Sequence, residues 1–213
     1  MASYGPNERC PKICTDTCGV GFGDMFAGRG GWGYDVGTPP GSRVDVGGIV
    51  ELTRNDLMRI GIISDTHDSG RYVRRALEVF AEQKVECILH AGDITGCSTA
   101  STLAMAPGSR MIAVFGNCDT ERLSLRSAIE TSGGEIHDRV FDGQVDGKTV
   151  CMMHIPRGIN HAAASGKYDL IVFGHTHRQD IQRSSTTLVV NPGAGQTVIV
   201  DTADMSATPQ SLA

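Results

Sequence analysis

The amino-acid sequence predicts a mixed α/β fold for the part of the chain that follows residue 57. Short apolar runs rich in β-branched residues alternate, as far as Thr131, with segments whose apolar residues have helical spacing. Further on, Asp146 and Gly147 separate two strand-like segments, a pattern typical of an antiparallel hairpin. Aspartate, asparagine and histidine follow several of the strand-like runs, which is where open α/β sheets place their functional residues.

Three strand-and-helix units are expected first. The run from Arg59 is apolar and β-branched until it stops at Ser64, so a buried strand is expected there. A helical face that includes Val73, Leu77 and Phe80 follows it. The expected elements are helices at 69–84, 98–106 and 121–131 and strands at 59–63, 85–89 and 111–115.

Mainly strands are expected after residue 139. The hairpin strands are placed at 140–145 and 148–153, and a short helix is placed at 160–165. Further strands are placed at 169–173, 181–183, 187–190 and 197–201, with a sharp turn at 191–193. The residues after Asp201 show no periodicity, so we expect one domain at 58–203 and a loose tail at 204–213.

Residues 1–57 differ in composition from the rest of the chain. They hold 12 of the 27 glycines and show no helical or strand periodicity, so we expect a Gly-rich, disordered or irregular extension. Cys10, Cys14 and Cys18 could hold an iron–sulfur cluster or zinc. Incidental thiols are the simpler interpretation, because no fourth ligand is evident nearby. An alternative is that Met58 is the natural start of the protein.

Composition narrows the class of function. The net charge of −5 gives no reason to favour binding to a nucleic-acid backbone, which usually requires a basic patch. No apolar run reaches the roughly 18 residues that a membrane span needs, and no secretory signal is recognisable. Seven scattered cysteines fit free thiols in a reducing compartment. We therefore expect a cytoplasmic protein.

Seven polar side chains at strand ends could form one metal site. They are three oxygen donors and four imidazoles, namely Asp65, His67, Asp93, Asn117, His154, His175 and His177. These donors are too many for one tetrahedral zinc ion, but they suit two cations of Mn, Fe, Ni or Zn type that share a carboxylate. Two such ions about 3.5–4 Å apart can hold a hydroxide for in-line attack on phosphorus.

The ordered motifs SDTH, AGD, GNCD, FGHTH and VNPGA, together with a histidine that ends a strand, resemble the calcineurin-like metallophosphoesterase superfamily. The resemblance is to its small YfcE-type phosphodiesterase branch and extends from Met58 to about Asp201. It implies a four-layer αββα sandwich of two packed mixed β-sheets flanked by helices. It also implies two divalent metal ions, usually Mn²⁺, with Ni²⁺, Fe or Zn²⁺ as substitutes.

The resemblance also implies roles for individual residues. Asp93 bridges the two ions. The remaining ligands of one ion are Asp65, His67 and His177, and those of the other are Asn117, His154 and His175. The catalytic residues implied are Asp65, His67, Asp93, Asn117 and His177.

Cys118 departs from the pattern of the wider superfamily. Many members have at this position a histidine that assists the leaving group, whereas the resembled branch typically has cysteine. A neutral thiol is a poor acid, so Cys118 favours substrates whose leaving group needs little protonation. Asp119 is then expected to orient Asn117 or His67.

The segment after His154 departs from the branch itself, which usually has glycine next. Here Ile155 and Pro156 follow, and Ile cannot adopt positive φ at low cost, so the approach of the backbone to the metal is expected to differ. Arg157 and His161 lie just beyond and are candidates for substrate contact, together with Asn117. A solvent-exposed arginine is the simpler alternative for Arg157.

Three functions are compatible with these residues. The first is a metal-dependent phosphodiesterase that acts on a small phosphodiester. The second is a phosphomonoesterase or nucleotide phosphatase. The third is a non-catalytic scaffold, like the retromer subunit that shares this fold. The expected partner is a small phosphoester substrate, without nucleic acid or membrane, and a homo-oligomer is left open.

Overall fold

The structure is a computed structural model that describes residues 58–213. The predictions for residues 1–57, including a ligand for Cys10, Cys14 and Cys18, lie outside the described residues.

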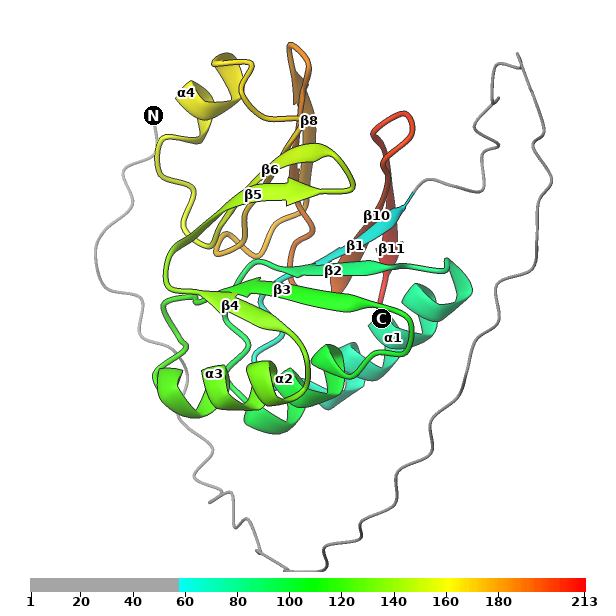
Figure 1. The fold of residues 1–213 in the computed structure, drawn as a ribbon, viewed down its shortest axis with the longest axis vertical. Coiled ribbons are helices and arrows are strands. Elements are labelled where there is room, and N and C mark those ends of the chain that lie inside the picture. Colours follow the sequence, from blue (N-terminus) through cyan, green and yellow to red (C-terminus); the bar gives the residue numbers. More distant parts are fainter. Residues whose placement is uncertain (1–57) are drawn as a thin grey trace, which may run out of the picture. The chain divides into compact units, whose positions relative to one another are not determined.

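Two mixed β-sheets form the centre of the described domain (Figure 1). The first sheet contains, in spatial order, β11 (Ser206–Ser211), β10 (Gln196–Asp201), β1 (Arg59–Ile63), β2 (Cys87–His90), β3 (Arg110–Val114) and β4 (Glu135–His137). The second contains β5 (Val140–Val145), β6 (Lys148–Met153), β7 (Leu170–Val172), β9 (Thr187–Asn191) and β8 (Asp180–Ser184). Strands β1 to β4 run parallel, as do β6, β7 and β9, so their carboxyl ends meet at common sheet edges.

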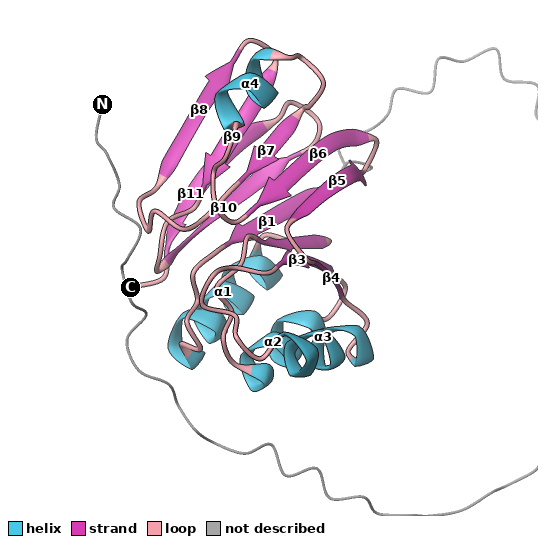
Figure 2. Cartoon of the chain, turned by 90° about the vertical axis from the view of Figure 1, so that its left-hand side faces the viewer, coloured by secondary structure: helices cyan, strands magenta, loops and turns pink. Residues whose placement is uncertain are grey.

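Helices cover the outer face of each sheet (Figure 2). The helices α1 (Gly70–Glu82), α2 (Cys97–Ala104) and α3 (Arg122–Thr131) pack on the first sheet, and α4 (Ile159–Ala164) packs on the second. The inner faces of the sheets form a shared core that includes Ile62, Leu89, Met152, Val172 and Val190. Burying such a side chain completely stabilises the fold by about 1.5–3 kcal/mol. The predicted four-layer αββα sandwich is confirmed.

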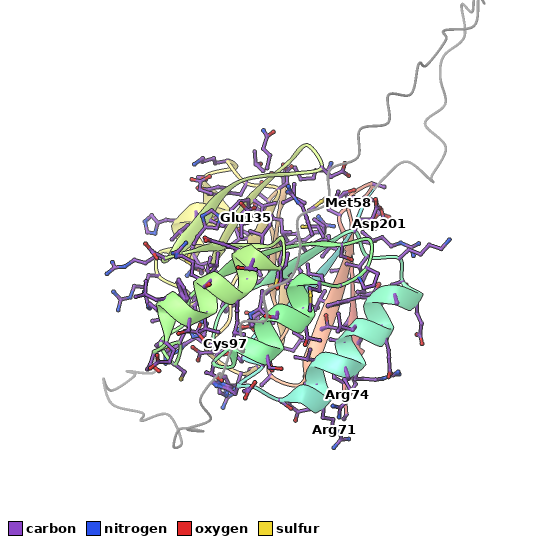
Figure 3. All side chains as sticks on the ribbon, turned by 60° about the horizontal axis from the view of Figure 1, so that its bottom comes forward. Met58, Arg71, Arg74, Cys97, Glu135 and Asp201 are labelled. Carbon is purple, nitrogen blue, oxygen red and sulfur yellow. The ribbon has the colours of Figure 1, made fainter. Side chains whose placement is uncertain are left out.

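Helix α1 illustrates how the sequence sets these contacts. The Ser69 side chain accepts a hydrogen bond from the Tyr72 backbone N–H and so caps the first turn. Phe80 on the buried helix face lies over Gly61 of β1, where a Cβ atom would come within 2.6 Å of the ring. Arg71 and Arg74 project from the opposite side of the helix (Figure 3). These two exposed arginines therefore belong to a solvent-facing surface.

The prediction of a loose tail at 204–213 is wrong. Ser206–Ser211 forms β11, an edge strand that pairs antiparallel with β10, and Leu212 beyond it is buried. This strand forms because β10 offers a free edge of backbone donors and acceptors, a cause that side-chain periodicity does not reveal. Its Pro209 is tolerated because an edge strand needs hydrogen bonds on one side only. The short β4 was likewise not predicted.

None of the helices among residues 58–213 is long and apolar enough to cross a membrane. No disulfide joins the cysteines of this part of the chain, which are Cys87, Cys97, Cys118 and Cys151.

Candidate metal centre

The seven residues predicted as ligands follow strands of both sheets. Asp65 and His67 follow β1, Asp93 follows β2, and Asn117 follows β3. The other three come from the second sheet, where His154 follows β6 and where His175 and His177 follow β7. Ligand atoms of Asp65, His67, Asp93 and His177 all lie within 4.8 Å of one another. These four side chains are the ones that the resemblance assigns to a single ion.

Two imidazole nitrogens converge within this group. The Nε2 atoms of His67 and His177 are 3.2 Å apart, and His177 Nε2 is 3.4 Å from Asp65 Oδ1. Asp65 is buried, accepts a hydrogen bond of 2.6 Å from the Ser64 hydroxyl, and receives the His175 backbone N–H at 3.2 Å. One cation placed among these atoms would satisfy both imidazoles at once, so the donor set fits a metal.

His154 links Asp93 to the second predicted group. Its Nδ1–H donates to the Ala91 carbonyl at 2.7 Å, and its Nε2 lies 3.3 Å from Asp93 Oδ2 and 2.9 Å from Asn117 Oδ1. Donation from Nδ1 leaves Nε2 as the nitrogen that can bind a metal. The ring of His175 lies beside that of His154, with centroids 5.2 Å apart. The donors on this side also fit a cation, and Asp93 belongs to both groups.

The ionisation states of Asp93 and His175 suit metal binding. Burial alone would raise the pKa of Asp93, but hydrogen bonding and the charge of His154, with the Cys118 backbone N–H, lower it to about 2. Burial works against protonation of His154, yet its contacts with Asp93 raise its pKa. Burial and the neighbouring His154 lower the pKa of His175. At neutral pH Asp93 is therefore an anion and His175 a neutral imidazole, the forms in which both bind metals.

The backbone is strained at five of the predicted ligands. Asp65, His67, Asp93, His175 and His177 have φ of 53°, 43°, 58°, 70° and 57°, in the left-handed region that favours glycine. Each such residue costs about 1–3 kcal/mol, and this strain is typical of functional sites. The surrounding contacts must hold these loops in place.

Asn191 is one such contact, and sequence reasoning placed it only in a turn. It is fully buried, and its Nδ2 donates to the Gly174 carbonyl at 3.1 Å and to Thr176 Oγ1 at 2.9 Å. Its Oδ1 accepts the Gly193 backbone N–H at 2.9 Å. Asn191 therefore holds the loop that carries His175. The VNPGA motif was the available signal for this role.

His90 is a packed, hydrogen-bonded histidine next to the site. It is fully buried; its Nδ1 accepts the Gly92 backbone N–H at 3.2 Å, which leaves Nε2–H to donate to Thr66 Oγ1 at 3.1 Å. The ring thus joins the loop after β1 to the loop after β2. It supports the site without facing it as a ligand.

We expect His90 to make the metal-free protein sensitive to acid. Burial and the charge of His154 lower its pKa from 6.5 to about 3. Between these values the unfolded chain binds a proton that the folded chain does not, so stability falls as the pH falls from about 6.5 toward 3, by about 1.4 kcal/mol per pH unit. Urea unfolding in EDTA at several pH values measures this slope. His90→Gln should give a shallower one, and equal slopes would contradict the prediction.

Other predicted residues lie apart from the cluster. Arg157 and His161 are exposed, and within residues 58–213 no hydrogen bond or ion pair connects either side chain to the predicted ligands. Ile155 and Pro156 do not displace His154, which remains 3 % exposed against Asp93. Asp119 was expected to orient Asn117 or His67, but its carboxylate instead accepts backbone N–H groups, so that expectation is wrong.

Residues 58–205 match the model of the calcineurin-like phosphoesterase superfamily domain. The chain belongs to this superfamily. A phosphodiesterase of Methanocaldococcus jannaschii is 32% identical over 139 residues, which cover 64% of this chain and 83% of that protein. A probable metallophosphoesterase of the same organism is 30% identical over 141 residues, 64% of this chain and 68% of that protein.

Several solved structures share the fold. A structure of an archaeal phosphodiesterase superposes with a TM-score of 0.67 at 28% identity, covering 72% of this chain and 99% of that one. The structure of YfcE, a phosphoesterase from E. coli, superposes with a TM-score of 0.52 at 19% identity, covering 73% of this chain and all of that one. The structure of Vps29 from Chaetomium thermophilum superposes with a TM-score of 0.54 at 16% identity, covering 71% of this chain and 85% of that one. The predicted resemblance to the calcineurin-like superfamily is confirmed by the match of residues 58–205. The similarities to YfcE and Vps29 concern the fold alone.

Proposed function

We propose that this chain is a metal-dependent phosphodiesterase that hydrolyses a small phosphodiester at a binuclear site. The observation that carries the proposal is the convergence of four ligand side chains within 4.8 Å, beside an Asp93 that also contacts His154. The match to a phosphodiesterase of Methanocaldococcus jannaschii supports the choice of a diester substrate.

Each ligand has a proposed place. Asp93 would bridge the two ions; Asp65, His67 and His177 would complete the first, and Asn117, His154 and His175 the second. When bound, two cations would supply a hydroxide for in-line attack and would neutralise charge on the phosphoryl oxygens. The His154 Nδ1–H donates to the Ala91 carbonyl, which leaves Nε2 as the nitrogen that would bind a metal, and the lowered pKa of His175 keeps that imidazole neutral.

The residues around the ligands shape the reaction. Asn117 is exposed, so its side chain can contact substrate as well as metal. The neighbouring Cys118 is a poor acid, which favours esters whose leaving group departs without protonation. Arg157 and His161 are proposed as further substrate contacts. We also propose Mn²⁺ as the preferred ion, with Ni²⁺, Fe or Zn²⁺ as substitutes, and a cytoplasmic location.

We expect hydrolysis of bis-p-nitrophenyl phosphate to be lost after treatment with EDTA and restored by Mn²⁺. The loss should exceed about a hundredfold, because metal ions contribute several kcal/mol of charge stabilisation and each 1.4 kcal/mol is tenfold in rate. The assay compares this diester with p-nitrophenyl phosphate at equal enzyme concentration. Restoration by Mn²⁺ with a preference for the diester is the expected result.

Two other outcomes would replace the proposal. Preferred turnover of p-nitrophenyl phosphate would identify a phosphomonoesterase or nucleotide phosphatase. Absence of metal-dependent turnover of both esters, in protein that holds two equivalents of Mn²⁺, would identify a non-catalytic scaffold.

A further inference from the structure

Asp119 is a buried carboxylate beside the site that binds none of the predicted ligand side chains. It is 2 % exposed, and within the described domain no lysine, arginine or histidine forms an ion pair with it. Its Oδ2 accepts the backbone N–H groups of Asp93 at 3.0 Å and Gly116 at 2.7 Å, and its Oδ1 accepts that of Thr95 at 2.8 Å. Three peptide dipoles therefore compensate its charge.

Two of these donors lie in strained backbone. Asp93 and Thr95 have φ of 58° and 65°, a conformation that is especially costly for a β-branched residue such as threonine. Hydrogen bonds to a charged acceptor are stronger than neutral ones. The Asp119 carboxylate can thus offset the strain of the segment from Asp93 to Thr95.

The contact between the two loops is reciprocal. While Asp119 accepts the Asp93 backbone N–H, the Cys118 backbone N–H donates to Asp93 Oδ1 at 2.8 Å. Asp93 is therefore fixed at its main chain by Asp119 and at its side chain by the neighbouring residue. Its other oxygen, Oδ2, remains directed at His154 (3.3 Å) and His67 (3.9 Å).

We propose that Asp119 is a positioning residue that fixes Asp93 in the orientation needed to bridge two metal ions. The inference rests on the proposed binuclear site and adds to it a residue that neither binds metal nor touches substrate. Removing one of the carboxylate's acceptor oxygens should free the Asp93 segment and weaken metal binding, even where the fold survives.

The test compares Asp119→Asn with Asp169→Asn in the full chain. Asp169 is a suitable control because its carboxylate also accepts a backbone N–H, from Thr149 at 2.7 Å, but it lies just before β7, at the opposite end of that strand from His175 and His177. Mn²⁺ binding is measured by isothermal titration calorimetry and thermal unfolding by circular dichroism. We expect Asp119→Asn to weaken Mn²⁺ binding by about 10–100-fold, the effect typical of residues that orient ligands. Asp169→Asn should lower the unfolding temperature without changing Mn²⁺ affinity.

A double variant separates positioning from stability. Adding Thr95→Gly to Asp119→Asn relieves the left-handed strain at residue 95, so it should restore folding. It should not restore Mn²⁺ affinity, because the Asp93 and Gly116 N–H groups still face a neutral amide side chain. This variant also provides the measurement if Asp119→Asn alone does not fold.

Wild-type Mn²⁺ affinity in Asp119→Asn, or its recovery together with stability in the double variant, would show that Asp119 is merely structural and would overturn the inference. Failure of the wild-type chain to bind Mn²⁺ would overturn the proposed function itself, and the inference with it.

Discussion

Asp93→Ala is expected to abolish binding of both metal ions and to lower diester hydrolysis by more than about a thousandfold, or about 4 kcal/mol of transition-state stabilisation. The reason is position: Asp93 lies within the group of Asp65, His67 and His177 and also contacts His154. Metal content after gel filtration in Mn²⁺ buffer, measured by plasma mass spectrometry, reports the loss directly.

Asn117→Ala is the matched comparison, because Asn117 contacts His154 but is not part of the first group. This variant should retain about one ion per chain. Two tightly held ions in Asp93→Ala would rule out the bridging assignment, and loss of both ions in Asn117→Ala would contradict the division of ligands between two metals.

Gly116→Ala is expected to destabilise the protein by about 3 kcal/mol, at the upper end of overpacking effects, and to impair metal binding. A Cβ atom at this position would overlap the Asp93 carboxylate and its backbone nitrogen and would lie 2.7 Å from Asp93 Cγ. The neighbouring atoms are held by Asp119 and Cys118, so they have little room to move. Urea unfolding and Mn²⁺ titration measure the two effects.

Gly70→Ala is the control for that substitution. Residue 70 begins α1, where an added Cβ would meet only Arg74 Nη1, at 3.7 Å. Alanine has a higher helix propensity than glycine, so stability should stay equal or rise by up to about 1 kcal/mol. An equal loss in both variants would mean that the effect at Gly116 does not arise from its contact with Asp93.

Much of the fold could be predicted, as could the position of the candidate ligands at strand ends, because both depend on local signals. Buried strands such as β1 are apolar and β-branched, and they end abruptly at polar residues that the sheet then brings to one edge. The strand β11 could not be predicted in this way, since SATPQS has no apolar alternation and its pairing depends on the free edge of β10.

The contacts that support the candidate site were harder to predict than the candidate ligands themselves. Asp119 lies next to Cys118 in sequence, yet its partners at Asp93 and Thr95 are 26 and 24 residues away and are backbone groups. Backbone donors are present at every residue except proline, so residue types give no sign of which ones a carboxylate will find. Closeness in sequence was also a poor guide. Arg157 and His161 lie near His154 in the sequence, yet their exposed side chains do not contact the predicted ligands.

The contact between His67 and His177, which are 110 residues apart in sequence, links metal binding to the folding of the chain. The two loops belong to different sheets, so a cation held between them would cross-link the halves of the sandwich. An unfolded or half-assembled chain cannot offer such a site, and ligand binding to the native state alone stabilises it in proportion to the logarithm of ligand concentration. A higher metal concentration would then increase the fraction of completely folded molecules. Resistance to proteolysis should therefore rise with Mn²⁺ concentration.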